Sequence, residues 1–94
     1  MALRGFQRQV KAYDKKKGWV NDRPEDAVLH MQEEVGEIAR NLLKRSGYKR
    51  GRYDSKSMND EITDLLYLTF KLGNLLELDL DEGWKRLGKR YKNK

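Results

Sequence analysis

Residues 58–78 read MNDEITDLLYLTFKLGNLLEL and decide the fold of this chain. Within this stretch, apolar side chains cover well over half of the circumference of an α-helix, which is more than a surface helix shows. These positions are Ile62, Leu65, Leu66, Leu68, Thr69, Phe70, Leu72, Leu75 and Leu76. The pattern predicts a helix from Met58 to about Leu78 that begins with a capping box of Ser57 and Asp60 and lies in the centre of a helical bundle.

Two helices are predicted before this central one. The first carries apolar residues at helical spacing, namely Leu3, Phe6, Val10 and Tyr13. It ends at Gly18, a residue typical of helix C-caps. The second begins at Pro24, with Asp22 or Arg23 as its cap, and ends near Ser46. Its apolar stripe is the clearest in the chain.

A loop and a fourth helix follow. Residues 46–57, SGYKRGRYDSKS, are polar, basic and without a sustained period, which predicts a loop. Asp79 and Glu82 resemble a second capping box, and a short basic helix is predicted after them. Its apolar edge consists of Trp84, Leu87 and Tyr91, and we expect Trp84 to belong to the core. Four helices without a strand pattern give an all-α fold class.

The composition predicts one domain, residues 1–94, that assembles with copies of itself. The chain has 94 residues and a single proline, with 37% hydrophobic and 38% charged residues. A monomer with this composition buries only a thin core and gains from burying more surface against a partner. We therefore expect a four-helix chain that completes a helical bundle through homo-oligomerisation.

The rarer residue types exclude several classes of protein. The chain has no cysteine and one histidine, which excludes disulfides and thiolate metal sites and leaves oxygen as the expected metal ligand. It has no signal-like apolar run and no stretch near the ~20 apolar residues of a membrane span, so we expect a soluble cytoplasmic protein. The net charge of +6 favours an anionic partner but does not distinguish a nucleotide from nucleic acid or a membrane surface.

Five acids lie on the second and third predicted helices. Glu34 lies at the margin of the apolar stripe, Glu37 about 60° further round, and Glu33 almost opposite the stripe. Glu61 falls inside the apolar arc of the third helix and Asp64 at its edge. A carboxylate inside an apolar arc is costly unless a cation compensates it. Two adjacent helices with acids at i and i+3 can surround one or two hard cations, while solvated acids or an ion pair with Lys or Arg remain alternatives.

The spacing of these acids resembles a known signature. EEVGE at residues 33–37 is followed, after twenty-three residues, by EITD at residues 61–64. The pair resembles the EExxE and ExxD motifs of the MazG-like nucleoside triphosphate pyrophosphohydrolases, which belong to the all-α NTP pyrophosphatase superfamily. The resemblance implies a helical dimer, or dimer of dimers, that cleaves an NTP or dNTP between the α- and β-phosphates to NMP and pyrophosphate in nucleotide-pool house-cleaning.

The resemblance also implies roles for the acids. Glu34, Glu37, Glu61 and Asp64 are expected to bind Mg²⁺, for which Mn²⁺ could substitute, and Glu33 to assist near the metal or its water. We expect a water nucleophile activated by a carboxylate or a metal, with Glu37 as the base and Glu33 as the alternative.

Further residues are candidates for binding the nucleotide. We predict phosphate contacts from Lys71 and Asn74 on the third helix, although Lys71 could equally pair with Asp64. Lys85 and Lys89 on the last helix could also clamp phosphates, and Trp19 could stack on the base or serve as a core residue. The alternative hypotheses are a basic helical nucleic-acid-binding module without catalysis and a structural bundle whose acids form interface ion pairs.

Overall fold

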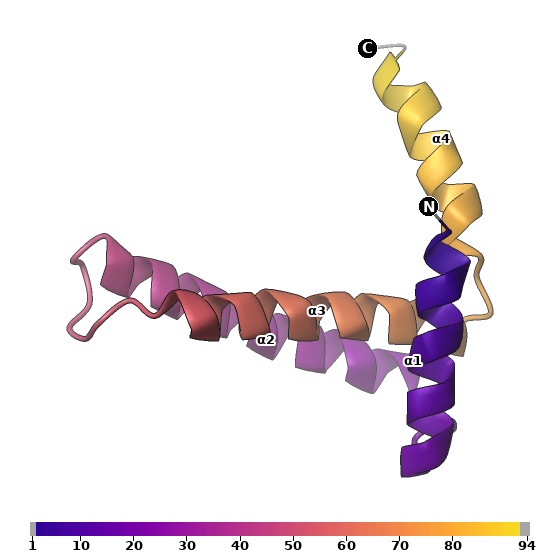
Figure 1. The fold of residues 1–94 in the computed structure, drawn as a ribbon, viewed down its shortest axis with the longest axis horizontal. Coiled ribbons are helices and arrows are strands. Elements are labelled where there is room, and N and C mark those ends of the chain that lie inside the picture. The colour runs from indigo at the N-terminus through magenta and orange to yellow at the C-terminus, as the bar shows by residue number, and fades with distance from the viewer. Residues whose placement is uncertain (1, 93–94) are drawn as a thin grey trace.

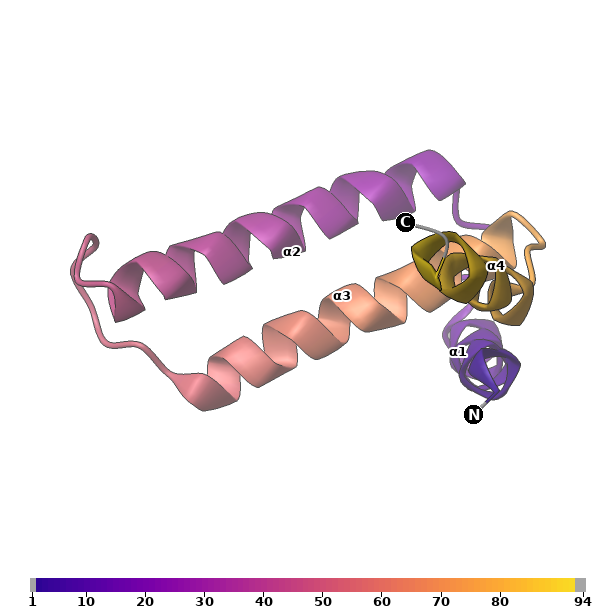
Figure 2. The same ribbon diagram turned by 90° about the horizontal axis from the view of Figure 1, so that it is seen from above.

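The computed structural model describes residues 2–92 and contains, in that range, four helices and no strand. The helices are α1 (Leu3–Lys17), α2 (Pro24–Arg45), α3 (Ser55–Leu75) and α4 (Leu80–Lys92). The predicted all-α class and the number of helices are confirmed. Helices α2 and α3 form a long antiparallel hairpin, α1 crosses the C-terminal end of α3, and α4 projects beyond the N-terminal end of α1 (Figures 1 and 2).

Helix α3 begins earlier than the sequence pattern predicts. Its N-cap is Asp54, whose side chain accepts a hydrogen bond of 3.1 Å from the backbone N–H of Lys56. The helix therefore starts at Ser55 and not at Met58, and the predicted capping box at Ser57 is wrong. Asp54 satisfies the free N–H groups of the first turn before Ser57 is reached.

The same helix also ends earlier, at Leu75 in place of about Leu78. The backbone N–H of Leu78 donates to the carbonyl of Gly73 at 2.8 Å, and the backbone N–H of Glu77 donates to the backbone carbonyl of Asn74 at 3.0 Å. Glu77 adopts a φ of 56°, the left-handed conformation that this terminating motif requires. The end of α3 at Leu75 could not be predicted from the sequence, because the left-handed position of this motif is usually a glycine and here it is Glu77.

The other boundaries agree more closely with prediction. Helix α1 ends at Gly18, which has a φ of 78°. Helix α2 begins at Pro24 with Arg23 as its N-cap, although neither Arg23 nor Asp22 provides a side-chain cap. The side chain of Asp79 accepts a hydrogen bond from the N–H of Asp81 at 3.0 Å just as α4 begins, so Asp79 caps this helix, although among the described residues Glu82 does not return the reciprocal bond of a capping box.

The hairpin is held by a seam of buried and half-buried side chains at heptad-like spacing. The seam positions on α2 are Ala27, Met31, Glu34, Ile38 and Asn41, and those on α3 are Met58, Glu61, Leu65, Leu68, Leu72 and Leu75. Two carboxylates and an amide thus occupy positions that an ordinary helical hairpin fills with apolar residues. The apolar core is thin, as the composition predicts.

The single chain is extended for its length. Its radius of gyration is 15.8 Å, whereas a compact domain of this length has about 12 Å. Its accessible surface is 7740 Å², against about 5,700 Å² for a folded monomer of this mass. About 2,000 Å² of surface per chain is therefore exposed beyond what a globular monomer shows. Trp84, predicted to be core, is 65% exposed in the single chain.

The junction between α1 and α4 depends on a buried amide. Gln7 donates from Nε2 to the carbonyl of Leu78 at 2.8 Å and accepts at Oε1 from the N–H of Leu80 at 3.1 Å. Asn74 on α3 donates from Nδ2 to the carbonyl of Gln7 at 2.8 Å. Gly73 lies directly under this amide, because a Cβ there would come within 3.2 Å of Gln7 and Leu80. These contacts fix α1 and the start of α4 against the end of α3.

Asp81 on α4 caps the N-terminus of α1 across the chain. Its carboxylate accepts from the N–H groups of Leu3 at 2.7 Å and Arg4 at 3.2 Å, and from the Arg4 guanidinium at 3.1 Å. The hydrogen bond from Leu3, followed by those from Arg4, lowers the pKa of Asp81 despite partial desolvation. The ionised carboxylate thereby replaces a local N-cap, since Ala2 offers no side-chain acceptor.

We predict that Asp81→Asn lowers the melting temperature at pH 7 by about 2 °C, because asparagine can still accept a hydrogen bond but loses the charge that strengthens the contacts with Leu3 and Arg4. Because the folded pKa lies below the unfolded value of ~4, the wild-type protein loses this stabilisation as the pH falls through the folded pKa. Thermal melts followed by circular dichroism from pH 7 to pH 3 should show the difference shrinking below about pH 4. Glu82→Gln, at the next residue, should leave the melting temperature unchanged. A difference for Asp81→Asn that is constant over this range would contradict the cap.

Candidate metal and nucleotide site

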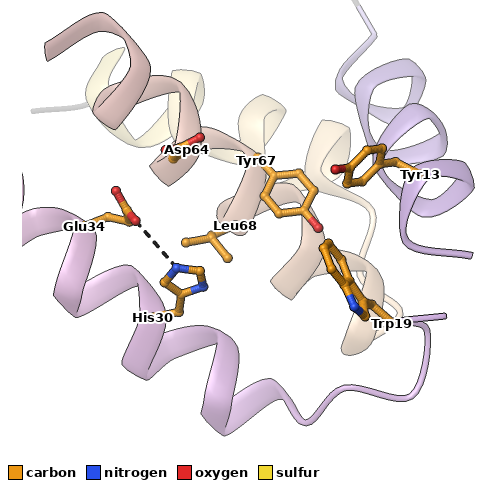
Figure 3. A pocket seen from close by; sticks show the side chains of 7 residues that line it. All are labelled: Tyr13, Trp19, His30, Glu34, Asp64, Tyr67 and Leu68. Carbon is orange, nitrogen blue, oxygen red and sulfur yellow. Dashed lines mark ion pairs between the residues drawn. The ribbon is translucent and has the colours of Figure 1, made fainter. Parts of the chain in front are cut away.

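A pocket of about 460 Å³ lies on one face of the hairpin, where α1 and the α1–α2 loop meet α2 and α3. The residues that line it are Tyr13, Trp19, His30, Glu34, Asp64, Tyr67 and Leu68. Figure 3 shows the two carboxylates gathered toward one end of the pocket and the three aromatic rings toward the other. The structure therefore brings three of the predicted site residues, Trp19, Glu34 and Asp64, into one pocket.

The acids of α2 differ in their surroundings. Glu34 is only 17% exposed in its side chain, and its Oε1 lies 3.5 Å from Nε2 of His30, one turn earlier (Figure 3). Glu33 and Glu37 are exposed and do not line the pocket. Glu37 follows Glu34 by three residues, so it lies on the neighbouring face of α2, one turn along the helix.

On α3, Glu61 occupies the seam and Asp64 the edge of the pocket. The half-buried Glu61 accepts from Nδ2 of Asn41 at 3.4 Å, and this amide also donates to the carbonyl of Asp54 at 3.3 Å. Within residues 2–92, neither Glu61 nor Asp64 forms an ion pair with a lysine or arginine. The ion-pair alternative for Glu61 is therefore not realised inside the single chain.

The predicted ligands have the chemistry that a hard divalent cation requires, because all are carboxylates. Their side chains do not converge on one position. In the described part of the chain, no three His, Asp or Glu side chains form a ready-made metal cluster. The candidate ligands Glu34, Glu37, Glu61 and Asp64 are all carboxylates on two facing helices, and among residues 2–92 only His30 lies within ion-pair distance of any of them. Like charges repel at such a site, so a bound cation would favour bringing these oxygens together.

The aromatic end of the pocket is built mainly from α1 and α3. The Tyr13 ring meets both Trp19 and Tyr67 edge to face, with centroids 5.9 Å apart in each pair. The Tyr67 hydroxyl donates to Asp14, which is buried. Burial, followed by this hydrogen bond and the charge of Asp14, raises the pKa of Tyr67 above its usual range, so the phenol stays protonated.

Sequence reasoning missed part of this aromatic wall. The sequence pattern places Tyr13 only on the apolar stripe of the first helix, and it does not distinguish Tyr67 from the other residues of the third helix. The available signal was the spacing of Tyr67, three residues after Asp64, which places both on adjacent faces of α3.

The remaining predicted nucleotide-binding residues do not line the pocket. Lys71 pairs with Asp22 and not with either pocket carboxylate, Glu34 or Asp64. Its Nζ lies 2.6 Å from Oδ2 of Asp22. Asn74 is bound to Gln7 at the α1–α3 junction. Lys85 and Lys89 are exposed on α4, which projects away from the hairpin (Figure 1).

No helix among residues 2–92 combines the length and the apolar character needed to cross a membrane.

Comparison with known proteins gives one informative similarity. No protein-family model matches this chain, and no solved structure matches it. The chain is 35% identical over 66 residues to the uncharacterized protein YpjD of Bacillus subtilis (strain 168). The matched region covers 68% of this chain but 60% of that protein, so the chain spans less than two thirds of its relative.

Proposed function

We propose that this chain is a Mg²⁺-dependent pyrophosphohydrolase that cleaves an NTP or dNTP between the α- and β-phosphates, giving NMP and pyrophosphate, in cytoplasmic nucleotide-pool house-cleaning. One observation carries the proposal, namely the polarity of the pocket. Glu34 and Asp64 lie toward one end, and Tyr13, Trp19 and Tyr67 toward the other. A nucleotide has the same polarity, with a phosphate chain that requires metal and a base that stacks on aromatic rings.

We assign different roles to the acids because their side chains differ in burial. Glu34 and Glu61 lie in the seam, where the hairpin restricts their side chains, whereas Asp64 and Glu37 are exposed and would have to turn toward the cation. When bound, Mg²⁺ would screen these carboxylates from the phosphates and polarise the phosphorus under attack. Glu37 is exposed to water and can accept the proton of an attacking water molecule, and Glu33 is the alternative base.

The proposal includes a homodimer, or a dimer of dimers, formed by the apolar face of the hairpin. This apolar face consists of Val28, Val35 and Leu42 on α2 and Ile62, Leu66 and Leu76 on α3, all exposed in the single chain. Between the two helices it continues into an open apolar groove lined by Met31, Leu65 and Leu72. Two hairpins packed through this face would form a four-helix bundle with the acids outside the contact. The ~2,000 Å² of surplus surface per chain is ample for such an interface.

The proposed activity is tested by a panel of ribonucleoside and deoxyribonucleoside triphosphates incubated with purified protein and Mg²⁺. We expect pyrophosphate from at least one member of the panel and none after chelation of the metal. Release of orthophosphate alone, or no release from any nucleotide, would overturn the proposal. Wild-type and Glu61→Gln protein purified in parallel control for a contaminating phosphatase.

A second candidate, nucleic-acid binding without catalysis, is favoured by the basic surface of α4. Lys85, Arg86, Lys89 and Arg90 are exposed and form no ion pair within residues 2–92. This function predicts binding to DNA or RNA that weakens steeply with salt but persists without Mg²⁺ and in Glu61→Gln. We place nucleic-acid binding second because it does not explain why a carboxylate, Glu61, is half-buried in the seam.

A further inference from the structure

Lys71 occupies a closed niche beside the aromatic end of the pocket. The residue is 7% exposed, and its ammonium lies 2.6 Å from Oδ2 of Asp22 and 5.2 Å from the centroid of the Trp19 ring. Asp22 and Trp19 both belong to the loop of residues 18–23 that joins α1 to α2. One side chain of α3 therefore holds this loop at two points, through an ion pair and a cation–π contact.

The loop has few other attachments. Its first residues are fixed to α1, since the N–H of Trp19 donates to the carbonyl of Asp14 at 2.7 Å. Further along, the side chain of Arg23 pairs only with Glu25, and both are exposed at the start of α2. Among the described residues, the Lys71–Asp22 pair is thus the polar side-chain link between this loop and α3.

The position of Lys71 also argues against a direct phosphate contact. It follows Asp64 by seven residues, about 10 Å along the helix, and therefore lies toward the aromatic end of the pocket. Its charge is already compensated by Asp22 and Trp19. To reach a phosphate near the acids, the buried ammonium would have to leave its ion pair with the partly exposed Asp22 and its contact with the Trp19 ring.

We propose that Lys71 and Asp22 are positioning residues that hold Trp19 in the pocket wall, so that a nucleobase meets an aromatic plane already in place. This inference rests on the proposed function for the identity of the ligand, and it reassigns Lys71 from phosphate contact to support of the base site. Loss of the pair detaches the loop from Lys71. Among the described residues, Trp19 is then held only on the α1 side, by Asp14 and Tyr13, so the base must order the Trp19 ring on binding. The cost falls on substrate binding and not on the chemical step.

The first test measures the loop without nucleotide or metal. The chain has two tryptophans and five tyrosines, so Trp84→Phe leaves Trp19 as the single tryptophan, and excitation at the red edge of the absorption band selects it over the tyrosines. In this background, Asp22→Asn and Lys71→Met should raise the acrylamide quenching constant of Trp19 by about twofold or more, because the ring becomes more accessible. Lys71→Arg should retain the wild-type value, since arginine can keep both contacts. Glu25→Gln removes the exposed Arg23–Glu25 pair and should change nothing. Quenching that is unchanged in Asp22→Asn and Lys71→Met would overturn the proposal.

The second test separates positioning from phosphate binding. With the best triphosphate of the panel, Asp22→Asn and Lys71→Met should each raise KM by about tenfold and leave kcat within about twofold. The double variant should be no worse than either single variant, because both remove the same pair. A large fall in kcat for Lys71→Met that Asp22→Asn does not share would show a phosphate contact and overturn the proposal. Circular dichroism of each variant establishes that the helices are retained.

The two proposals fail separately. The quenching measurement needs no activity, so it decides whether the pair holds Trp19 even if the wild-type protein hydrolyses no nucleotide. The panel decides the proposed function without reference to Trp19.

Discussion

Glu61→Gln is expected to reduce the Mg²⁺-dependent release of pyrophosphate by about 100-fold or more while the protein stays folded. Glu61 is half-buried in the α2–α3 seam, and within residues 2–92 its carboxylate has the amide of Asn41 but no lysine or arginine as partner. Glutamine keeps the shape and can still accept from Asn41, but it removes the negative charge that would hold a cation. Initial rates at saturating Mg²⁺, together with thermal melts, measure the two effects.

Asp60→Asn is the matched control for this substitution. Asp60 precedes Glu61 on α3, is exposed and lies outside the acid motifs, and its side chain has no partner within residues 2–92. Its rate should stay within about twofold of wild type, because surface acids away from the site contribute little. A wild-type rate in Glu61→Gln, or an equal loss in Asp60→Asn, would remove the argument that the buried position of Glu61 matters.

Val35→Asp is expected to separate the proposed oligomer into single chains of 11.1 kDa. Val35 lies in the middle of the apolar face and is 52% exposed in the single chain, so a partner hairpin would bury it. An unpaired carboxylate at that position costs several kcal/mol. This cost corresponds to a weakening of the dimer dissociation constant by more than ~100-fold. Light scattering during size-exclusion chromatography, or sedimentation equilibrium, gives the mass directly.

Leu29→Asp provides the comparison on the same helix. Leu29 is 57% exposed, lies about 120° around α2 from Val35 and does not line the apolar groove. The same charge introduced there should leave the mass of the oligomer unchanged. If the wild-type protein is a monomer at micromolar concentration, or if both substitutions dissociate it equally, the apolar face is not the interface.

The helices were predictable because their signals are local. The periodicity of apolar residues gave all four helices, and Gly18 and Pro24 gave the end of α1 and the start of α2. The limits of α3 were not predictable in the same way. Asp54 caps the helix ahead of Ser57, and Glu77 takes a left-handed conformation that sequence usually assigns to glycine.

The placement of two candidate site residues was predictable, because the spacing along a single helix decides on which side of that helix each one lies. The spacing on α2 and α3 placed Glu34 and Asp64 toward one another, and both line the pocket. The partners of Tyr67 and Lys71 could not be found in this way, because Asp14 and Asp22 are separated from them by 53 and 49 residues. Their contacts depend on how α1 crosses α3, which no helical periodicity encodes.

The proposed activity requires that the acid end of the pocket direct cleavage to the bond between the α- and β-phosphates. ³¹P NMR of the reaction with the best triphosphate of the panel follows every phosphorus of substrate and product in one sample. NMP and pyrophosphate signals are expected to grow together in equal amounts with Mg²⁺ and not to grow with chelator. Growth of nucleoside diphosphate and orthophosphate signals in their place would overturn the proposed function.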